Sequence, residues 1–131
     1  MPPIDRSNHE TRYTKEHEWV RMEGDVATVG ITDHAVEALG DLVFIELPEI
    51  GREVSRDEAC AVVESVKAAS DVYAPLSGTI VEANQPAVED PAMVSTNAEG
   101  DGWFFKIQLD DPEEFEELMD EAEYQDYLES L

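Results

Sequence analysis

The sequence predicts a mostly β domain, an antiparallel barrel or sandwich with one short internal helix and helices at its C-terminus. Short runs rich in Val, Ile and aromatic residues recur between Gly and Pro residues, a pattern typical of antiparallel strands joined by tight turns. From residue 112 onward the apolar side chains follow helical spacing instead. With 131 residues, of which 42% are hydrophobic, the chain is long enough for one core and too short for two ordinary domains.

The first expected elements are an arm and a hairpin. Residues 1–12 are polar and carry no periodic pattern, so we expect a flexible N-terminal arm there and a single domain over 13–131. The β-rich runs 17–23 and 26–31 are separated by Gly24-Asp25, a pair that tolerates the backbone angles of a tight turn. These two runs are therefore expected to pair as a β-hairpin.

A short helix and a strand are expected next. Thr32 is a suitable N-cap for a helix over 33–39, and Gly40 is a suitable residue to end it. The run 42–47 is apolar at most positions and is followed by Pro48, which is typical of the end of a strand.

The middle of the chain predicts a second hairpin followed by a further strand. Runs 59–66 and 69–75 flank Lys67, and run 79–84 follows the turn at 76–78. Lys67 is one of three lysines in a chain of net charge −24. A lysine displayed between two strands and flanked by short apolar residues favours covalent loading by another enzyme over a role in solubility.

The C-terminal third predicts one helical turn at 91–94, a strand at 103–109 and two helices. Asp111 and Pro112 are typical of a helix start. The expected buried positions of the two helices are Phe115, Leu118, Met119, Ala122, Tyr124, Tyr127, Leu128 and Leu131. We interpret these helices as a cover over the β core.

The charge excludes several classes of partner. Thirty-two acidic residues against eight basic ones repel nucleic acid phosphates and anionic lipid headgroups, so we expect no nucleic acid and no membrane partner. Self-repulsion of this size is screened at high ionic strength, which is typical of a halophilic protein. An acidic surface that docks basic partner enzymes explains the same composition, and the two readings are compatible.

Cysteine usage and the absence of targeting signals predict a cytoplasmic chain. The lone Cys60 has no internal disulfide partner and lies in an apolar run, which favours a packed core thiol over a nucleophile. The first thirteen residues lack the apolar segment of a secretory signal. No apolar run approaches the roughly 20 residues that span a bilayer.

No ordinary active site can be assembled from the sequence. GxSxG, P-loop, HExxH and CxxC motifs are all missing, and His9, His17 and His34 are dispersed along the chain. The acidic run 113–123 lacks the alternating ligands and central Gly of an EF-hand, so a solvated helix face explains it better than calcium. We therefore expect no metal and a carrier whose chemistry belongs to a cofactor.

Four blocks of the sequence together resemble the glycine cleavage system H protein, a lipoyl-carrier family, over residues 13–128. The blocks are YTKEHEWV (13–20), VGITDHAVEALGDLVFIELPEIG (29–51), ESVKAASDVYAPLSGTIVEAN (64–84) and GWFFKI (102–107). Biotin carriers flank their lysine with methionines, whereas Val66 and Ala68 stand here. Lipoyl domains of 2-oxo acid dehydrogenases place Asp before the lysine and lack the first block.

The resemblance implies a barrel-sandwich hybrid fold and a lipoyl arm in amide linkage to Lys67, in the manner of a halophilic prokaryotic member. It further implies that Glu18 and Asp71 shelter the loaded arm in a cleft. The chain departs from the family pattern at Ser95 and at Ala98-Glu99.

The implied cycle links a monomeric, non-catalytic carrier to four enzymes. The arm takes an aminomethyl group from glycine decarboxylase (P protein), passes it to aminomethyltransferase (T protein) and is reoxidised by dihydrolipoyl dehydrogenase (L protein). A lipoate ligase or lipoyltransferase attaches the arm. A lipoyl relay protein that serves other carriers, or an unmodified acidic interaction protein, remains the alternative.

Overall fold

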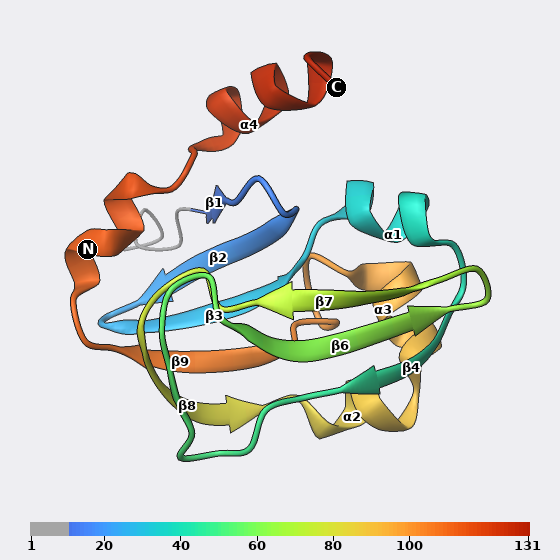
Figure 1. Cartoon of the computed structure of the whole chain (residues 1–131), viewed down its shortest axis with the longest axis horizontal. Coiled ribbons are helices and arrows are strands. Elements are labelled where there is room, and N and C mark those ends of the chain that lie inside the picture. The colour runs from blue at the N-terminus through green and yellow to red at the C-terminus, as the bar shows by residue number, and fades with distance from the viewer. Residues whose placement is uncertain (1–10) are drawn as a thin grey trace, which may run out of the picture.

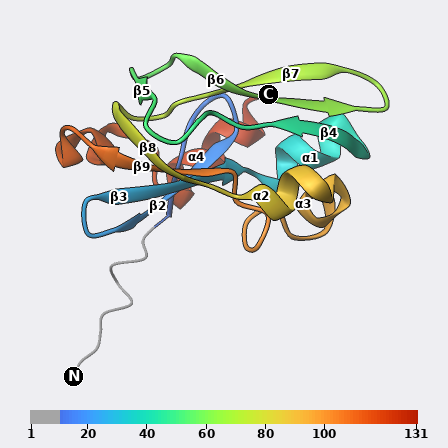
Figure 2. The ribbon, with the colours of Figure 1, turned by 90° about the horizontal axis from the view of Figure 1, so that it is seen from below.

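The computed structural model describes residues 11–131 and consists of two antiparallel sheets with a core between them (Figures 1 and 2). The six-stranded sheet has the order β1-β2-β3-β9-β8-β5, and the three-stranded sheet has the order β4-β6-β7. The strands are β1 (Thr11–Tyr13), β2 (Glu18–Glu23), β3 (Val26–Ile31), β4 (Leu42–Glu46), β5 (Glu53–Val54), β6 (Ala59–Ser65), β7 (Ala69–Tyr73), β8 (Gly78–Ala83) and β9 (Phe105–Leu109). The two sheets and their helices confirm the predicted barrel-sandwich fold.

The predicted first hairpin and internal helix are confirmed. β2 and β3 pair from Glu18 opposite Ile31 to Glu23 opposite Val26, and Gly24 adopts the positive φ of 63° that the turn needs. Helix α1 (Asp33–Leu39) begins at Thr32, whose side chain accepts a hydrogen bond from the backbone of the third helical residue.

The strand β1 includes two residues that the sequence assigned to the N-terminal arm. β1 begins at Thr11 and pairs with β2, so residues 11 and 12 belong to the sheet and not to an arm. The remainder of the predicted arm, residues 1–10, lies outside the described residues.

Two further differences lie between β8 and β9. Helix α2 (Gln85–Glu89) was not expected, and α3 (Pro91–Asn97) extends well beyond the predicted single turn. The predicted strand at 103–109 begins only at Phe105, because the Asn84 side chain donates hydrogen bonds to the carbonyls of Asp101 and Trp103 and holds them in a loop.

The predicted helix from Pro112 is interrupted at Leu118. A 3₁₀ helix, η2 (Pro112–Glu117), ends there because Met119 forms two backbone hydrogen bonds with Tyr13 across an isolated bridge. Phe115 and Leu118 are buried as predicted, whereas the expected buried position Ala122 is exposed, because the chain changes direction before it.

Helix α4 (Glu121–Glu129) forms the second C-terminal helix. A capping box between Asp120 and Glu123 starts it. Its Tyr124 ring stacks on Tyr13 with 4.5 Å between centroids, and both join the buried Trp19 in a small second core. The expected buried Leu131 is 67% exposed, and α4 itself packs against β1.

Candidate functional site

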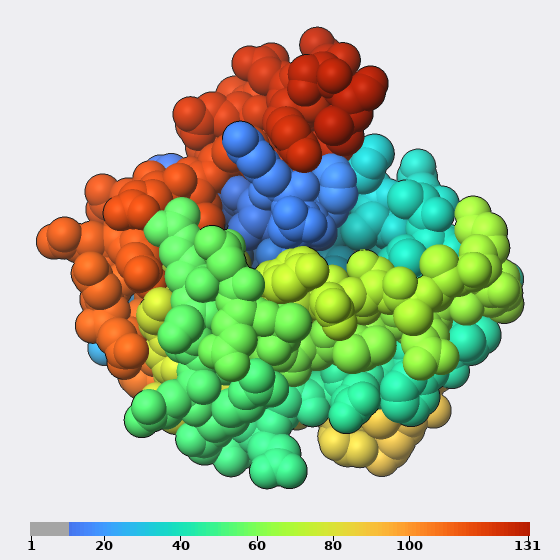
Figure 3. All heavy atoms as spheres, in the orientation of Figure 1, coloured from blue at the N-terminus to red at the C-terminus, as the bar shows by residue number. Residues whose placement is uncertain are grey.

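Lys67 lies exposed at the tip of the β6–β7 hairpin, which projects beside α1 in the space-filling view (Figure 3). The Ser65 hydroxyl oxygen accepts hydrogen bonds from the backbone N–H groups of Lys67 and Ala68, both at 3.1 Å. The Ser65 backbone N–H donates to the Ala68 carbonyl at 2.7 Å. These contacts fix the backbone of the lysine while its side chain stays exposed.

The hairpin tip is also fastened to the body of the domain. The Val66 N–H donates to the Asp41 carbonyl at 3.0 Å, directly after α1. Gly40 has φ 89° and ψ −159°, a conformation that is essentially restricted to glycine. A Cβ at this position would lie 3.3 Å from Lys67 Cε, so the lysine side chain rests against Gly40. Sequence reasoning assigned Gly40 only to the helix end and missed this contact.

Glu18 opens β2 and is only 2% exposed. The Thr14 hydroxyl donates to its Oε1 at 2.8 Å, and the Tyr73 backbone N–H donates to its Oε2 at 2.9 Å. Both hydrogen bonds favour the ionised form, but burial outweighs them and raises the pKa of Glu18 to about 7. The carboxyl group therefore exchanges its proton near neutral pH.

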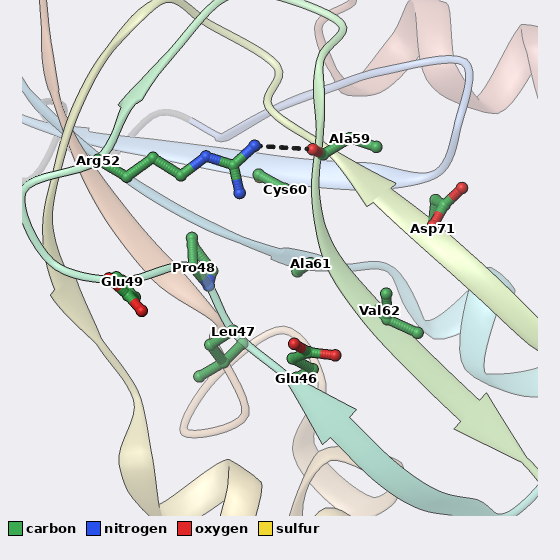
Figure 4. A pocket seen from close by; sticks show the side chains of 10 residues that line it. All are labelled: Glu46, Leu47, Pro48, Glu49, Arg52, Ala59, Cys60, Ala61, Val62 and Asp71. Atoms are coloured by element: carbon green, nitrogen blue, oxygen red, sulfur yellow. Dashed lines mark hydrogen bonds between the residues drawn. The ribbon is translucent and has the colours of Figure 1, made fainter.

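Asp71 lies exposed on β7, on the face of the three-stranded sheet that points away from the core. It borders a hollow of about 440 Å³ together with Glu46, Arg52 and Cys60 (Figure 4). Arg52 is held there by hydrogen bonds to the side chain of Glu58 and to the carbonyl of Ala59.

Glu18 borders a different hollow, of about 390 Å³, beside Arg56 and Glu117, which form an ion pair. The structure thus does not bring the Glu18 and Asp71 carboxylates into one hollow. Both nevertheless lie along β7, since Glu18 binds the N–H of Tyr73, two residues or about 7 Å along the strand from Asp71. Their common role in sheltering an arm stays a prediction.

The remaining candidate residues are placed as follows. Cys60 is buried, and burial raises the pKa of its thiol to about 12, which agrees with the predicted core thiol. His17 and His34 lie apart in the sequence, but the turn before β2 and helix α1 bring their ring centroids to 4.5 Å. His17 Nδ1 also lies 2.9 Å from the Tyr124 hydroxyl. Burial lowers the pKa of His17, and the nearby His34 lowers it further. His9 lies outside the described residues.

Metal binding and membrane spanning find no support in residues 11–131. No cluster of three or more His, Cys, Asp or Glu side chains there is arranged to hold a metal ion. No helix within these residues is long and apolar enough to cross a bilayer.

Two of the residues that depart from the family pattern, Ala98 and Glu99, contact β2 and the start of α1. The Ala98 carbonyl accepts the indole N–H of Trp19 at 2.9 Å. A carboxylate oxygen of Glu99 accepts the backbone N–H of Asp33, the first residue of the helix, at 2.8 Å. Because α1 ends against the lysine hairpin, this loop supports the helix that seats Lys67.

Two packed sheets that present a lysine at the tip of a hairpin form the architecture of a lipoyl- or biotinyl-carrier domain. The model of the Glycine cleavage H-protein family matches residues 11–131. The chain therefore belongs to this family.

Individual relatives agree with the family match over nearly the whole chain. A glycine cleavage system H protein of Acidiphilium cryptum is 62% identical over 93% of this chain and 98% of the relative. One of Parvibaculum lavamentivorans is 56% identical over 92% of this chain and 96% of the relative. The crystal structure of a glycine cleavage system H protein from Mycobacterium marinum superposes with a TM-score of 0.84 at 45% identity, covering 94% of this chain and 98% of that one.

Proposed function

We propose that the chain is the lipoyl carrier of the glycine cleavage system, with lipoic acid in amide linkage to Lys67 Nζ. The observation that supports this assignment best is the geometry of the hairpin. Ser65 fixes the backbone of Lys67, and Gly40 leaves room for its side chain, so the amine is held in place yet open to another enzyme. Membership in the family gives the same reading.

Attachment is an acyl transfer performed by a lipoate ligase or lipoyltransferase. Nζ of Lys67 gives up a proton to that enzyme and attacks the activated acyl carbon of its lipoyl donor. The amide bond forms and the activating group leaves. Lysine stem and acyl chain together reach on the order of 10 Å or more beyond the backbone.

When bound, the lipoyl group supplies a disulfide that takes up an aminomethyl group and is afterwards reoxidised. The hairpin presents this arm in turn to glycine decarboxylase (P protein), aminomethyltransferase (T protein) and dihydrolipoyl dehydrogenase (L protein). The chain itself contributes presentation and shelter and performs no catalytic step.

Glu18 and Asp71, which border two neighbouring hollows along β7, would each offer a carboxylate to the ammonium group of a loaded arm. Two carboxylates next to one strand offer charge-assisted hydrogen bonds, which are shorter and stronger than neutral ones. Glu18 is the more buried of the two carboxylates, and an ammonium group nearby favours its ionised form. Support comes from the position of both residues along β7, within a strand length of Lys67.

The carrier acts as a soluble monomer in the cytoplasm, and its surface is adapted to salt. Its net charge of −24 opposes association with further copies. The buried, unpaired Cys60 agrees with a reducing compartment.

Intact-mass measurement after incubation with a lipoate ligase tests the proposal. We expect a lipoyl-sized increment on the peptide that contains Lys67, and neither an increment nor glycine-dependent turnover with P, T and L proteins for Lys67→Arg. Full turnover by Lys67→Arg contradicts the proposal. A lipoylated wild-type chain that fails in glycine turnover but donates lipoate to other carriers identifies a relay protein instead.

A further inference from the structure

Exposed apolar side chains gather around the lysine hairpin. Val43 is 55% exposed, Phe44 46% and Val66 68%. All three lie where β4 meets the hairpin tip, since Leu42 pairs with Ser65 and Phe44 pairs with Glu64. We name Val43, Phe44 and Val66 the tip surface.

Three other large apolar side chains among residues 11–131 are exposed but lie elsewhere, and one of them, Leu131, is at the C-terminal end behind α4. Ile50 is 67% exposed in the loop after β4, and Val81 is 41% exposed on β8. Ile50 precedes Gly51, whose N–H binds the Ile80 carbonyl, so these two residues belong to the β8 side of the molecule. They provide matched controls for the tip surface.

Negative charge surrounds the tip surface. Asp41 and Glu64 are both exposed and lie next to the tip surface. The Asp41 carbonyl accepts a hydrogen bond from the Val66 N–H, and Glu64 pairs with Phe44 across the two strands. An apolar patch with an acidic rim fits a partner that has an apolar contact area with Lys or Arg at its edge.

The short side chain of the unmodified lysine indicates which enzyme must contact the tip surface. Lys67 Nζ lies only 3.9 Å from the point that a Cβ atom on Gly40 would occupy, so the free amine lies close to the protein surface. An enzyme that acylates this amine has to bring its acyl donor within about 3 Å of Nζ. Its surface must then contact residues around the hairpin, whereas enzymes that meet the end of the finished arm approach on the order of 10 Å further out.

We infer that the tip surface is the docking site for the enzyme that acylates Lys67, which meets it with an apolar area rimmed by basic side chains. This inference rests on the proposed lipoylation of Lys67. It adds to that proposal the surface by which the acylating enzyme recognises this chain.

The test compares serine substitutions on and off the tip surface. Initial rates of lipoylation are measured by intact mass with purified ligase, lipoate and ATP over a range of concentrations of the unlipoylated chain. We expect Phe44→Ser and Val66→Ser each to raise KM about tenfold, as truncation of an interface residue worth about 1.4 kcal/mol does, with kcat unchanged within about twofold. The controls Ile50→Ser and Val81→Ser should keep the wild-type KM within about twofold.

Several results overturn the inference. Equal KM values for tip and control variants refute docking at the tip surface, and a loss confined to kcat shows that these residues shape the hairpin instead. A wild-type kcat/KM that does not fall as salt rises refutes the basic rim. Thermal melts establish that each variant is folded. Absence of lipoylation in the wild-type chain overturns the proposed function itself, whereas normal lipoylation of the tip variants overturns only this inference.

Discussion

Glu18→Gln is expected to make the folded chain more stable at alkaline pH and to leave its stability at acidic pH nearly unchanged. Glu18 is almost completely buried, and burial raises its pKa from the ordinary value of 4.5 to about 7. Between these two values the folded chain holds a proton that the unfolded chain has released. Stability contributed by this group is therefore complete below about pH 4.5 and is lost as the pH rises through about 7.

The magnitude follows from the size of the shift. One pKa unit corresponds to about 1.4 kcal/mol, so a pKa that rises from 4.5 to about 7 lowers the free energy of unfolding by about 3 kcal/mol between pH 4 and pH 8. Glutamine keeps the shape of the side chain and carries no titrating proton. Its oxygen can accept the Tyr73 N–H, and its amide can donate to the Thr14 hydroxyl.

Urea unfolding of both chains at fixed salt, followed by tryptophan fluorescence, measures the effect. The relevant quantity is the free energy of unfolding of the Glu18→Gln variant minus that of the wild-type chain, because self-repulsion and histidine titration are common to both chains and largely cancel. We expect this difference to grow by about 3 kcal/mol from pH 4 to pH 8. A difference that stays constant over this range refutes the reasoning that burial controls the Glu18 carboxyl group.

Three further predictions concern the protection of the loaded lipoyl arm, the glycine beside Lys67 and the surface charge. Asp71→Asn should shorten the lifetime of the aminomethyl-loaded carrier, followed by mass, without reducing lipoylation, and an unchanged decay rate would remove Asp71 from the shelter. Gly40→Ala should lower the free energy of unfolding by about 1–3 kcal/mol, because φ is 89° there; urea unfolding equal to that of the wild-type chain would contradict this. The midpoint of thermal unfolding should rise between 0.1 and 1 M salt, where the Debye length falls from about 10 to 3 Å, and a midpoint indifferent to salt would argue against salt adaptation.

Local signals explain the parts of the fold that the sequence predicted well. Gly24, Thr32 and Gly40 each meet a backbone requirement of their own turn or cap, so neighbouring residues suffice to place the first hairpin and α1. Lys67 is found in the same way, because its hairpin is closed by the adjacent Ser65.

The errors arose where distant residues decide the structure. The late start of β9 depends on the Asn84 side chain, and the break after η2 depends on the pairing of Met119 with Tyr13. Neither partner is close in sequence to the segment that it changes. Periodicity alone therefore predicted a longer strand and a longer helix than the chain forms.

The same limit applies to the site. A glutamate at the start of a strand gives no sign that it will be buried, and Glu18 becomes so only because β7 passes over it. The proximity of His17 to His34 likewise requires the β2–β3 hairpin to fold back before α1. Phe44 lies in an apolar run that predicted only a strand, and nothing in that run showed that β4 would form an edge of its sheet and leave this ring half exposed.

The edge position of β7 has a consequence for the behaviour of the chain at high concentration. An uncovered edge strand offers unpaired backbone groups to which another molecule can add a strand, which is a common route to aggregation. Here Glu18 already occupies the N–H of Tyr73, and the charge of Asp71 stands on the same strand. A strand added at this edge by another molecule would have to displace the Glu18 carboxyl group and lie next to the Asp71 carboxylate. Both costs disfavour aggregation through β7 and leave the hairpin accessible to enzymes.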